Sequence, residues 1–98
     1  LSTVISARDD QFVLDVGVKG VGDEYGPPQI LGHPEFEIPR FKSEEHTIVK
    51  AARHSLQVGD PVRIVPSHSC ATCNLHERIV VHEGDQIRDI WPIEGRGY

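Results

Sequence analysis

Short runs of apolar and β-branched residues recur along the chain, and each has the length of a strand rather than of a helix. Turn-forming residues such as Asp9, Asp10, Gly59 and Asp60 separate them. This alternation predicts an all-β fold, either a small antiparallel β-barrel or a β-sandwich. The predicted strands are residues 3–5, 12–14, 62–65, 79–81 and 87–91.

The last two predicted strands are joined by residues 82–86, a connection of hairpin length in which Gly84 supplies a left-handed position. A C-terminal β-hairpin is therefore the most sharply specified element. Residues 43–54 are less clear, because Ser43 suits a helix cap whereas residues 47–49 favour a strand, and we expect the strand. Residues 17–34 hold five glycines and three prolines, which predicts a structured surface loop.

Length and charge narrow the class of protein. Ninety-eight residues without an internal repeat predict a single domain, residues 1–98, with one modest core. The formal net charge is -5 and the ten Lys and Arg residues are scattered, so nucleic acid is not an expected partner. No apolar run approaches the roughly 20 residues of a membrane span, and no signal peptide is evident, so we expect a cytoplasmic protein.

Two further observations concern the chain's context. Cys70 and Cys73 are too few and too close to form a disulfide framework, so reduced thiols are expected. The chain starts at Leu1 and contains no methionine. We therefore expect that it is a fragment from which an N-terminal part is missing.

The densest group of metal-competent side chains lies in residues 66–76, directly after a predicted strand. On extended backbone, residues two apart point to the same side, so the His68 imidazole and the Cys70 thiolate could both reach one ion. Nitrogen with sulfur suits zinc better than magnesium or calcium. Two protein ligands would leave coordination positions open for water or substrate, which is typical of a catalytic site.

The residues alone leave alternatives open. His68 could make an ordinary loop hydrogen bond while Cys70 packs as a small apolar group. Cys73 and His76 could join them in a closed four-ligand zinc site, although four ligands within nine residues would fix only their own loop. Cys70 and Cys73 could also form a redox pair, but the strand–helix setting of such motifs is not evident.

Two charged groups could support a metal site as hydrogen-bonding neighbours of the ligands. One contains His46 after two glutamates, and the other contains Asp15 and Lys19 near two glycines. The alternatives are a solvated charged edge for the first group and a salt-bridged turn for the second. No lysine lies in an apolar stretch that would favour a Schiff base, and no nucleophile–base pair is apparent, so no catalytic residue is assigned within the chain.

Several motifs taken in order resemble the C-terminal domain of the D-serine dehydratase and D-threonine aldolase family. Nearly the whole chain takes part, and the combination of the Glu-Glu-His, Val-Gly-Asp and Pro-x-His-x-Cys elements is far more specific than any one of them. The motifs are residues 15–19, 43–46, 56–60 and 66–70, Trp91, and residues 96–97.

The resemblance implies an enzyme similar to alanine racemase, in which an N-terminal β/α barrel carries pyridoxal phosphate and a C-terminal β domain completes the active site. It implies that His68 and Cys70 are metal ligands, with zinc favoured by the thiolate, although some aldolases carry a carboxylate at this position and use manganese or a similar ion. His46 and Asp15 are the candidates for orienting these ligands. The expected partners are the missing barrel, a second subunit of the parent protein and a small D-amino acid.

The resulting expectation is the metal-bearing domain of a pyridoxal-phosphate-dependent lyase acting on a D-β-hydroxy amino acid such as D-threonine or D-serine. The ion would act on the substrate β-hydroxyl, in aldol cleavage or in elimination, and the fragment alone would be inactive. A stand-alone zinc-binding or interaction module is the alternative. The sequence departs from the family pattern at Ser67, Cys73 and Thr47, and Cys73 leaves open whether a third protein group binds the metal.

Overall fold

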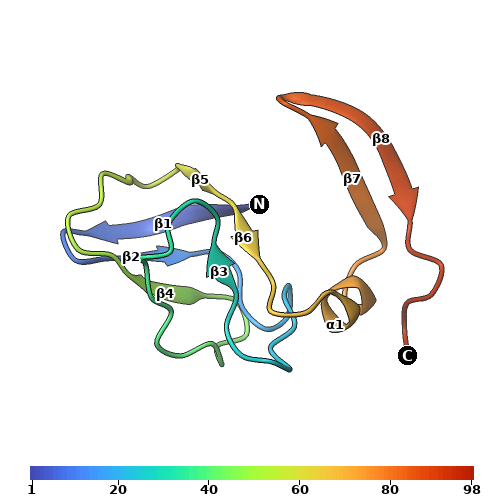
Figure 1. Ribbon diagram of the computed structural model, residues 1–98, viewed down its shortest axis with the longest axis horizontal. Helices are drawn as coiled ribbons and strands as arrows, with labels where there is room; N and C mark the ends of the chain where they lie inside the picture. The colour runs from blue at the N-terminus through green and yellow to red at the C-terminus, as the bar shows by residue number, and fades with distance from the viewer.

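The computed structural model describes all residues from 1 to 98 and contains eight strands and one short helix, which confirms the predicted all-β class (Figure 1). The order of elements is β1 (Ser2–Arg8), β2 (Gln11–Leu14), β3 (Gln29–Ile30), β4 (Thr47–Lys50), β5 (Pro61–Val62), β6 (Ile64–Val65), α1 (Ser69–Asn74), β7 (Arg78–Glu83) and β8 (Gln86–Pro92).

The main sheet has the strand order β4-β2-β1-β5, and every neighbouring pair is antiparallel. Burial alternates along β2 and β4, so that Phe12, Leu14 and Val49 point to one face and their neighbours to the other. This is the period of two expected of a strand with one covered face. The sheet curves around its buried face as an open half-barrel (Figure 1).

A second antiparallel pair, β3 with β6, contributes to the same core. The segment before β4 also supplies buried residues, and Phe12 packs edge to face against Phe36 with ring centroids 5.7 Å apart. One compact apolar cluster therefore stabilises residues 1–65. Its buried members are Val4, Phe12, Leu14, Val21, Ile30, Ile38, Phe41, Val49, Ala51 and Val62.

Three predictions about local structure are confirmed in the first 65 residues. β1 and β2 contain the predicted strands, β4 shows that residues 43–54 contain a strand rather than a helix, and residues 17–34 are irregular apart from the two residues of β3. The predicted strand at 62–65 is instead divided at Arg63. β5 pairs with β1 and β6 pairs with β3, because the chain passes here from one sheet to the other.

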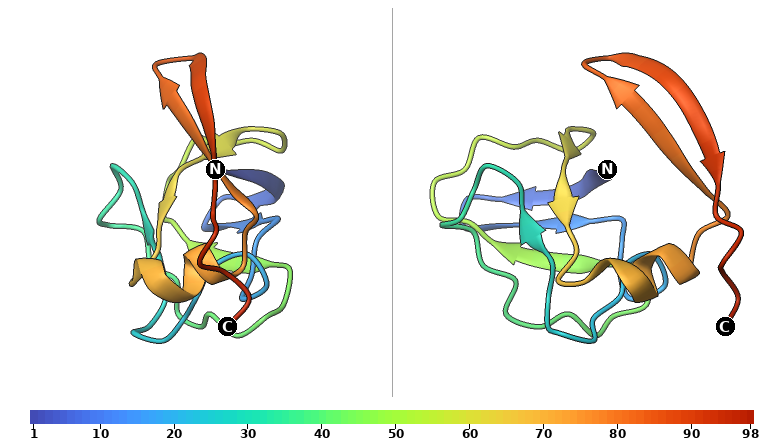
Figure 2. Two further views of the ribbon diagram at one scale, coloured as in Figure 1. Left: turned by 90° about the vertical axis from the view of Figure 1, so that its right-hand side faces the viewer. Right: turned by 45° about the vertical axis from the view of Figure 1, so that its right-hand side comes forward.

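The predicted C-terminal hairpin is confirmed as β7 and β8, which extend away from the half-barrel (Figures 1 and 2). The hairpin contains no fully buried side chain. Its base is closed by a hydrogen bond from the Ile93 amide to the Glu77 carbonyl. The hairpin is thus ordered by its own backbone pairing rather than by a core.

The C-terminal tail returns to the helix that precedes the hairpin. The Asn74 side-chain oxygen accepts hydrogen bonds from the amides of Gly97, at 2.6 Å, and Tyr98, at 3.0 Å. Its side-chain nitrogen donates to the Tyr98 carbonyl oxygen at 2.8 Å. Both ends of residues 75–96 therefore meet at Asn74.

None of the structure's helices combines the length and the apolar character needed to cross a membrane.

Candidate functional site

The candidate metal ligands lie where the chain passes from extended backbone into α1. His68 is the N-cap residue, with φ −152° and ψ 145°, and Cys70 lies in the first turn of the helix. The extended backbone on which the pairing of His68 with Cys70 was argued therefore ends at His68, and strand periodicity does not place the two side chains on one side. Within the helix, Thr72 donates its hydroxyl to the His68 carbonyl oxygen at 3.3 Å.

The imidazole nitrogens of His68 and the sulfur of Cys70 have no hydrogen-bond partner within the chain, and neither cysteine forms a disulfide. Cys70 is exposed, and the His68 ring packs edge to face on Tyr25 with ring centroids 5.1 Å apart. An uncommitted imidazole and an accessible thiol are a donor set that suits zinc. The two side chains therefore have the chemistry of zinc ligands, while a two-ligand metal site stays a prediction.

The closed four-ligand alternative is not supported by the arrangement of side chains. His76 donates from Nε2 to the Gly20 carbonyl oxygen at 2.7 Å, so this imidazole is engaged in holding a loop. The structure contains no group of three or more His, Cys, Asp or Glu side chains placed to hold a metal ion. Cys73 is half-buried in α1 rather than gathered with further donors.

A loop of residues 16–22 fixes the position of α1. The Gly22 amide donates to the Thr72 hydroxyl at 3.0 Å, next to the contact between His76 and Gly20. A Cβ atom on Gly22 would lie 2.8 Å from the Ala71 Cβ, so the loop reaches the helix only because residue 22 is glycine. The helix that carries Cys70 is thus held by contacts distant in sequence.

The same loop is fixed on its other side by the segment before β4. The amides of Val18 and Lys19 donate to the carbonyls of Ser43 and Glu44 at 2.9 and 3.0 Å. A Cβ atom on Gly17 would lie 2.2 Å from the Ser43 carbonyl oxygen, which no substituted residue tolerates without a shift of backbone. Loop 16–22 therefore contacts residues 43–44 on one side and α1, which follows the motif at residues 66–70, on the other.

Lys19 from one of the predicted charged groups pairs with the two glutamates of the other. Lys19 Nζ lies 3.1 Å from Glu45 Oε1 and 3.3 Å from Glu44 Oε2. The hydrogen bonds to Glu45 and Glu44 raise the pKa of Lys19, and the hydrogen bond from Lys19 lowers the pKa of Glu45. His46 is exposed beside this network and makes no hydrogen bond within the chain.

Asp15, the other proposed supporting residue, is engaged with the start of β1. Its carboxylate accepts hydrogen bonds from the Ser2 hydroxyl at 2.6 Å and the Thr3 amide at 2.8 Å. The Ser2 hydroxyl, followed by the Thr3 amide, lowers the pKa of Asp15 below its ordinary value. Neither Asp15 nor His46 is hydrogen-bonded to His68 or Cys70, so their role in orienting the ligands stays a prediction.

Sequence reasoning did not identify Thr72 and Tyr25 as parts of the site. A hydroxyl within a short segment and an exposed aromatic residue in a loop carry no distinctive pattern. The closely spaced Gly20 and Gly22 were the available signal, because glycine is selected where backbone approaches another segment closely.

The chain is similar in sequence to a known family and to several enzymes. Residues 1–82 match the family described as "Putative serine dehydratase domain". The chain is 37% identical over 101 residues to a D-threonine aldolase of Arthrobacter sp., covering 100% of this chain and 26% of that one. It is 32% identical over 98 residues to a 3-hydroxy-D-aspartate aldolase of Paracoccus denitrificans, covering 99% of this chain and 25% of the relative.

Among solved structures, the chain is similar to a D-threonine aldolase from Filomicrobium marinum. The TM-score is 0.87 at 30% sequence identity, with 97% of this chain and 27% of the other covered. The chain thus spans about a quarter of the length of each of these three relatives.

Proposed function

The chain belongs to the serine dehydratase domain family, and from that premise we propose that it is the C-terminal, metal-bearing domain of a lyase acting on D-β-hydroxy amino acids. The observation that carries this proposal is the pair of side chains without hydrogen-bond partners, His68 and Cys70, at the start of a helix that loop 16–22 holds in place. The relatives named as aldolases of D-threonine and 3-hydroxy-D-aspartate support the substrate class.

His68 and Cys70 would hold the ion, with zinc favoured by the imidazole and thiolate pair and manganese as the alternative. A bound ion would supply Lewis-acid polarisation of the substrate's β-oxygen. Residues around the ligands would support the site by holding the ligands in place. The contacts of Gly22 with Thr72 and of Gly20 with His76 hold α1, and thereby both ligands, against the half-barrel.

His46 and Asp15 are proposed to influence the ligands from further away. Asp15 fixes the start of β1 through Ser2 and Thr3, and His46 follows the segment that anchors loop 16–22. Such supporting residues act by limiting the movement of ligands rather than by binding the ion.

The rest of the active site would come from an N-terminal domain that carries pyridoxal phosphate. The chain covers only 26% of the Arthrobacter aldolase, so such a parent has ample length for a cofactor-binding domain. We propose that the parent forms a homodimer and works in the cytoplasm, where its thiols stay reduced. This domain alone would have no lyase activity.

Metal content and lyase activity of the full-length protein test the proposal. His68→Ala and Cys70→Ala should each lower metal affinity by at least about 100-fold. They should lower kcat/KM with D-threonine or D-serine in parallel. Metal should be measured by equilibrium dialysis with elemental analysis, and restoration of activity by excess zinc or manganese should be assayed.

Matched controls are His33→Ala and Cys73→Ala, since His33 pairs with Glu35 on the surface and Cys73 lies three residues from Cys70. Both should keep stoichiometric metal and activity. Full metal content in the His68 and Cys70 variants would contradict the proposal. Loss of zinc in Cys73→Ala, together with unfolding of the domain on chelation, would instead indicate a closed structural zinc site.

A further inference from the structure

Cys70 and Cys73 are separated by two residues, in the Cys-x-x-Cys spacing that dithiol–disulfide sites use. The strand–helix setting of such sites is not evident from the sequence, but the structure contains it. β6 ends at Val65, and α1 begins at Ser69 and carries both cysteines, which are free thiols. The proposed function uses Cys70 alone, so it leaves this pairing unexplained.

The backbone of α1 sets the separation of the two residues. Cα atoms three residues apart on an α-helix are about 5 Å from one another, within the roughly 4.4–6.8 Å that disulfides span. The Cβ atoms, about 5–6 Å apart on a regular helix, must approach to about 4 Å. A 3₁₀ winding brings side chains three residues apart into line. α1 already ends in bonds of this type, from the Leu75 and His76 amides to the Thr72 and Cys73 carbonyl oxygens.

The two cysteines lie on the side of α1 that faces away from loop 16–22. This loop contacts residues 71 and 72, through the hydrogen bond of the Gly22 amide and the close approach of its Cα to residue 71. Residues 71 and 72 lie about 100° and 200° around the helix from Cys70, whereas Cys73 lies about 60° from it. The contacts that hold the helix therefore leave the side with both thiols uncovered.

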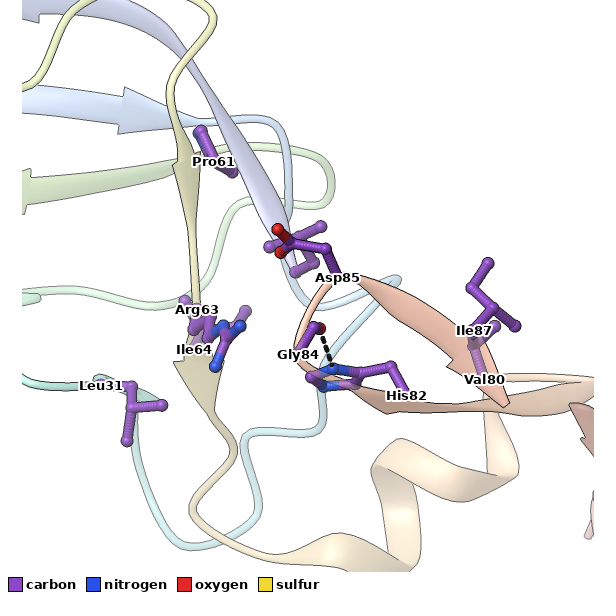
Figure 3. A pocket seen from close by; sticks show the side chains of 10 residues that line it. Leu31, Pro61, Arg63, Ile64, Val80, His82, Gly84, Asp85 and Ile87 are labelled. Carbon is purple, nitrogen blue, oxygen red and sulfur yellow. Dashed lines mark hydrogen bonds between the residues drawn. The ribbon is translucent and has the colours of Figure 1, made fainter. Parts of the chain in front are cut away.

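Solvent reaches the thiols directly. Cys70 is exposed, Cys73 is half-buried, and α1 has no fully buried residue. Neither cysteine lines the groove between the half-barrel and the hairpin (Figure 3), so occupation of that groove would leave both thiols accessible. A small oxidant therefore meets Cys70 first, and Cys73 is the neighbouring thiol that attacks the Cys70 sulfur afterwards.

We propose that Cys70 and Cys73 form a reversible dithiol–disulfide site whose oxidants are low-molecular-weight disulfides. The Cys70 thiolate attacks one sulfur of the oxidant, whose S–S bond breaks and releases one thiolate. The Cys73 thiolate then attacks the Cys70 sulfur, forms the intramolecular S–S bond and expels the second thiolate. Two electrons and two protons pass from the protein to the oxidant, which is reduced to two thiols.

The disulfide would switch off the candidate metal site. Zinc binds the thiolate form of cysteine, so the bridge withdraws Cys70 and leaves His68 as the remaining donor of the pair. This consequence rests on the proposed function, whereas formation of the disulfide does not.

Thiol trapping in the full-length protein tests the site. The reduced, metal-free protein would be incubated with glutathione disulfide, treated with iodoacetamide and digested with trypsin. Both cysteines lie in the peptide 64–78, because no Lys or Arg stands between Arg63 and Arg78. Mass spectrometry of this peptide distinguishes the intramolecular disulfide, a glutathione adduct and two alkylated thiols. The matched variant is Cys73→Ala, which keeps the exposed thiol and removes the second one.

We expect the protein with both cysteines to give mainly the intramolecular disulfide. Cys73→Ala should instead retain glutathione on Cys70, at a level at least about tenfold higher, because no second thiol displaces it. Dithiothreitol should restore the free thiols in both. Equal glutathione adducts in the two proteins, without a disulfide, would show that Cys73 does not reach Cys70 and would overturn the proposal. Two alkylated thiols in the protein with both cysteines would also overturn it.

Zinc separates this proposal from the proposed function. Zinc bound before oxidation should slow disulfide formation by at least about tenfold, because a coordinated thiolate is withheld from exchange. Elemental analysis should find that the oxidised protein has lost the zinc that the reduced protein binds. A disulfide that forms equally fast with and without zinc would confirm the dithiol–disulfide site and contradict the role of Cys70 as a metal ligand.

Discussion

The half-barrel and the β7–β8 hairpin are built from similar sequences but differ in what their side chains contact. Val4, Val49 and Val62 are buried in the half-barrel, whereas Val80 in the hairpin is 50% exposed. Strand formation in both follows from β-branched residues and tight turns. Burial requires a second layer, and only the half-barrel has one. Local sequence thus specifies a strand, while stability depends on what covers it.

The sharpest test of this contrast is removal of a large core side chain. Phe12 is fully buried and packs against Phe36 and His54. Phe12→Ala should lower the free energy of unfolding by about 3–5 kcal/mol, because it removes apolar burial and leaves a cavity. Urea denaturation followed by circular dichroism measures the loss. A change below about 1 kcal/mol would mean that the core is more adaptable than its packing indicates.

A glycine in the loop that supports the site should have the next largest effect. Gly17→Ala places a Cβ against the Ser43 carbonyl oxygen, so that the backbone must move. It should lower the free energy of unfolding by about 2 kcal/mol. The control is Gly95→Ala, just after the hairpin, where a Cβ would meet nothing within 4 Å. Equal melting temperatures of the two variants would contradict the close approach of loop 16–22 to residues 43–44.

Asp15 offers a smaller effect with a defined pH dependence. Asp15→Asn should lower the free energy of unfolding by about 1 kcal/mol at neutral pH, because it weakens the charge-assisted hydrogen bonds from Ser2 and Thr3. The effect is no larger because the carboxylate is exposed to solvent. Asp89→Asn is the control in the hairpin, where Asp89 accepts a hydrogen bond from the Trp91 side chain. It should have little effect.

The sign of the pH dependence follows from the lowered pKa of Asp15. In the folded chain this pKa lies below its ordinary value of 3.8. The stabilisation is therefore complete above 3.8 and is lost as the pH falls through the folded-state pKa. The free energies of unfolding of the unmodified chain and of Asp15→Asn, measured by urea titration, should converge in that acidic range. A difference that persists there would show that the loss is not electrostatic.

The smallest effect on stability is expected in the hairpin. Trp91 is large but 53% exposed and packs against no core residue. Trp91→Ala should change the free energy of unfolding of this chain by only about 0.5 kcal/mol, far less than a buried aromatic residue. Urea denaturation of Trp91→Ala and Phe12→Ala under one set of conditions makes the comparison direct. A cost near that of Phe12→Ala would show that the hairpin packs against the half-barrel.

Sequence reasoning succeeded where the signal was local. The hairpin and β4 follow from β-branched runs and a glycine-containing turn, and the family motifs pointed to the correct relatives. It failed where tertiary contacts decide. The division of residues 62–65 at Arg63 depends on two different partner strands, β1 and β3, which no local pattern reveals.

The candidate site shows the same limit. His68 and Cys70 as metal ligands stay a prediction. The helix at Ser69–Asn74 was missed, because six short residues give no helical periodicity. The contact of loop 16–22 with Thr72 and His76 spans about half the chain in sequence. Such a contact is fixed by the fold as a whole, and a single sequence contains no direct record of it.

The return of the tail to Asn74 makes residues 75–96 an excursion with coincident ends. A segment that leaves and re-enters the fold at one point can change in length without altering the spacing of the residues on either side. The hairpin is therefore a place where insertions and deletions can be tolerated without displacement of α1.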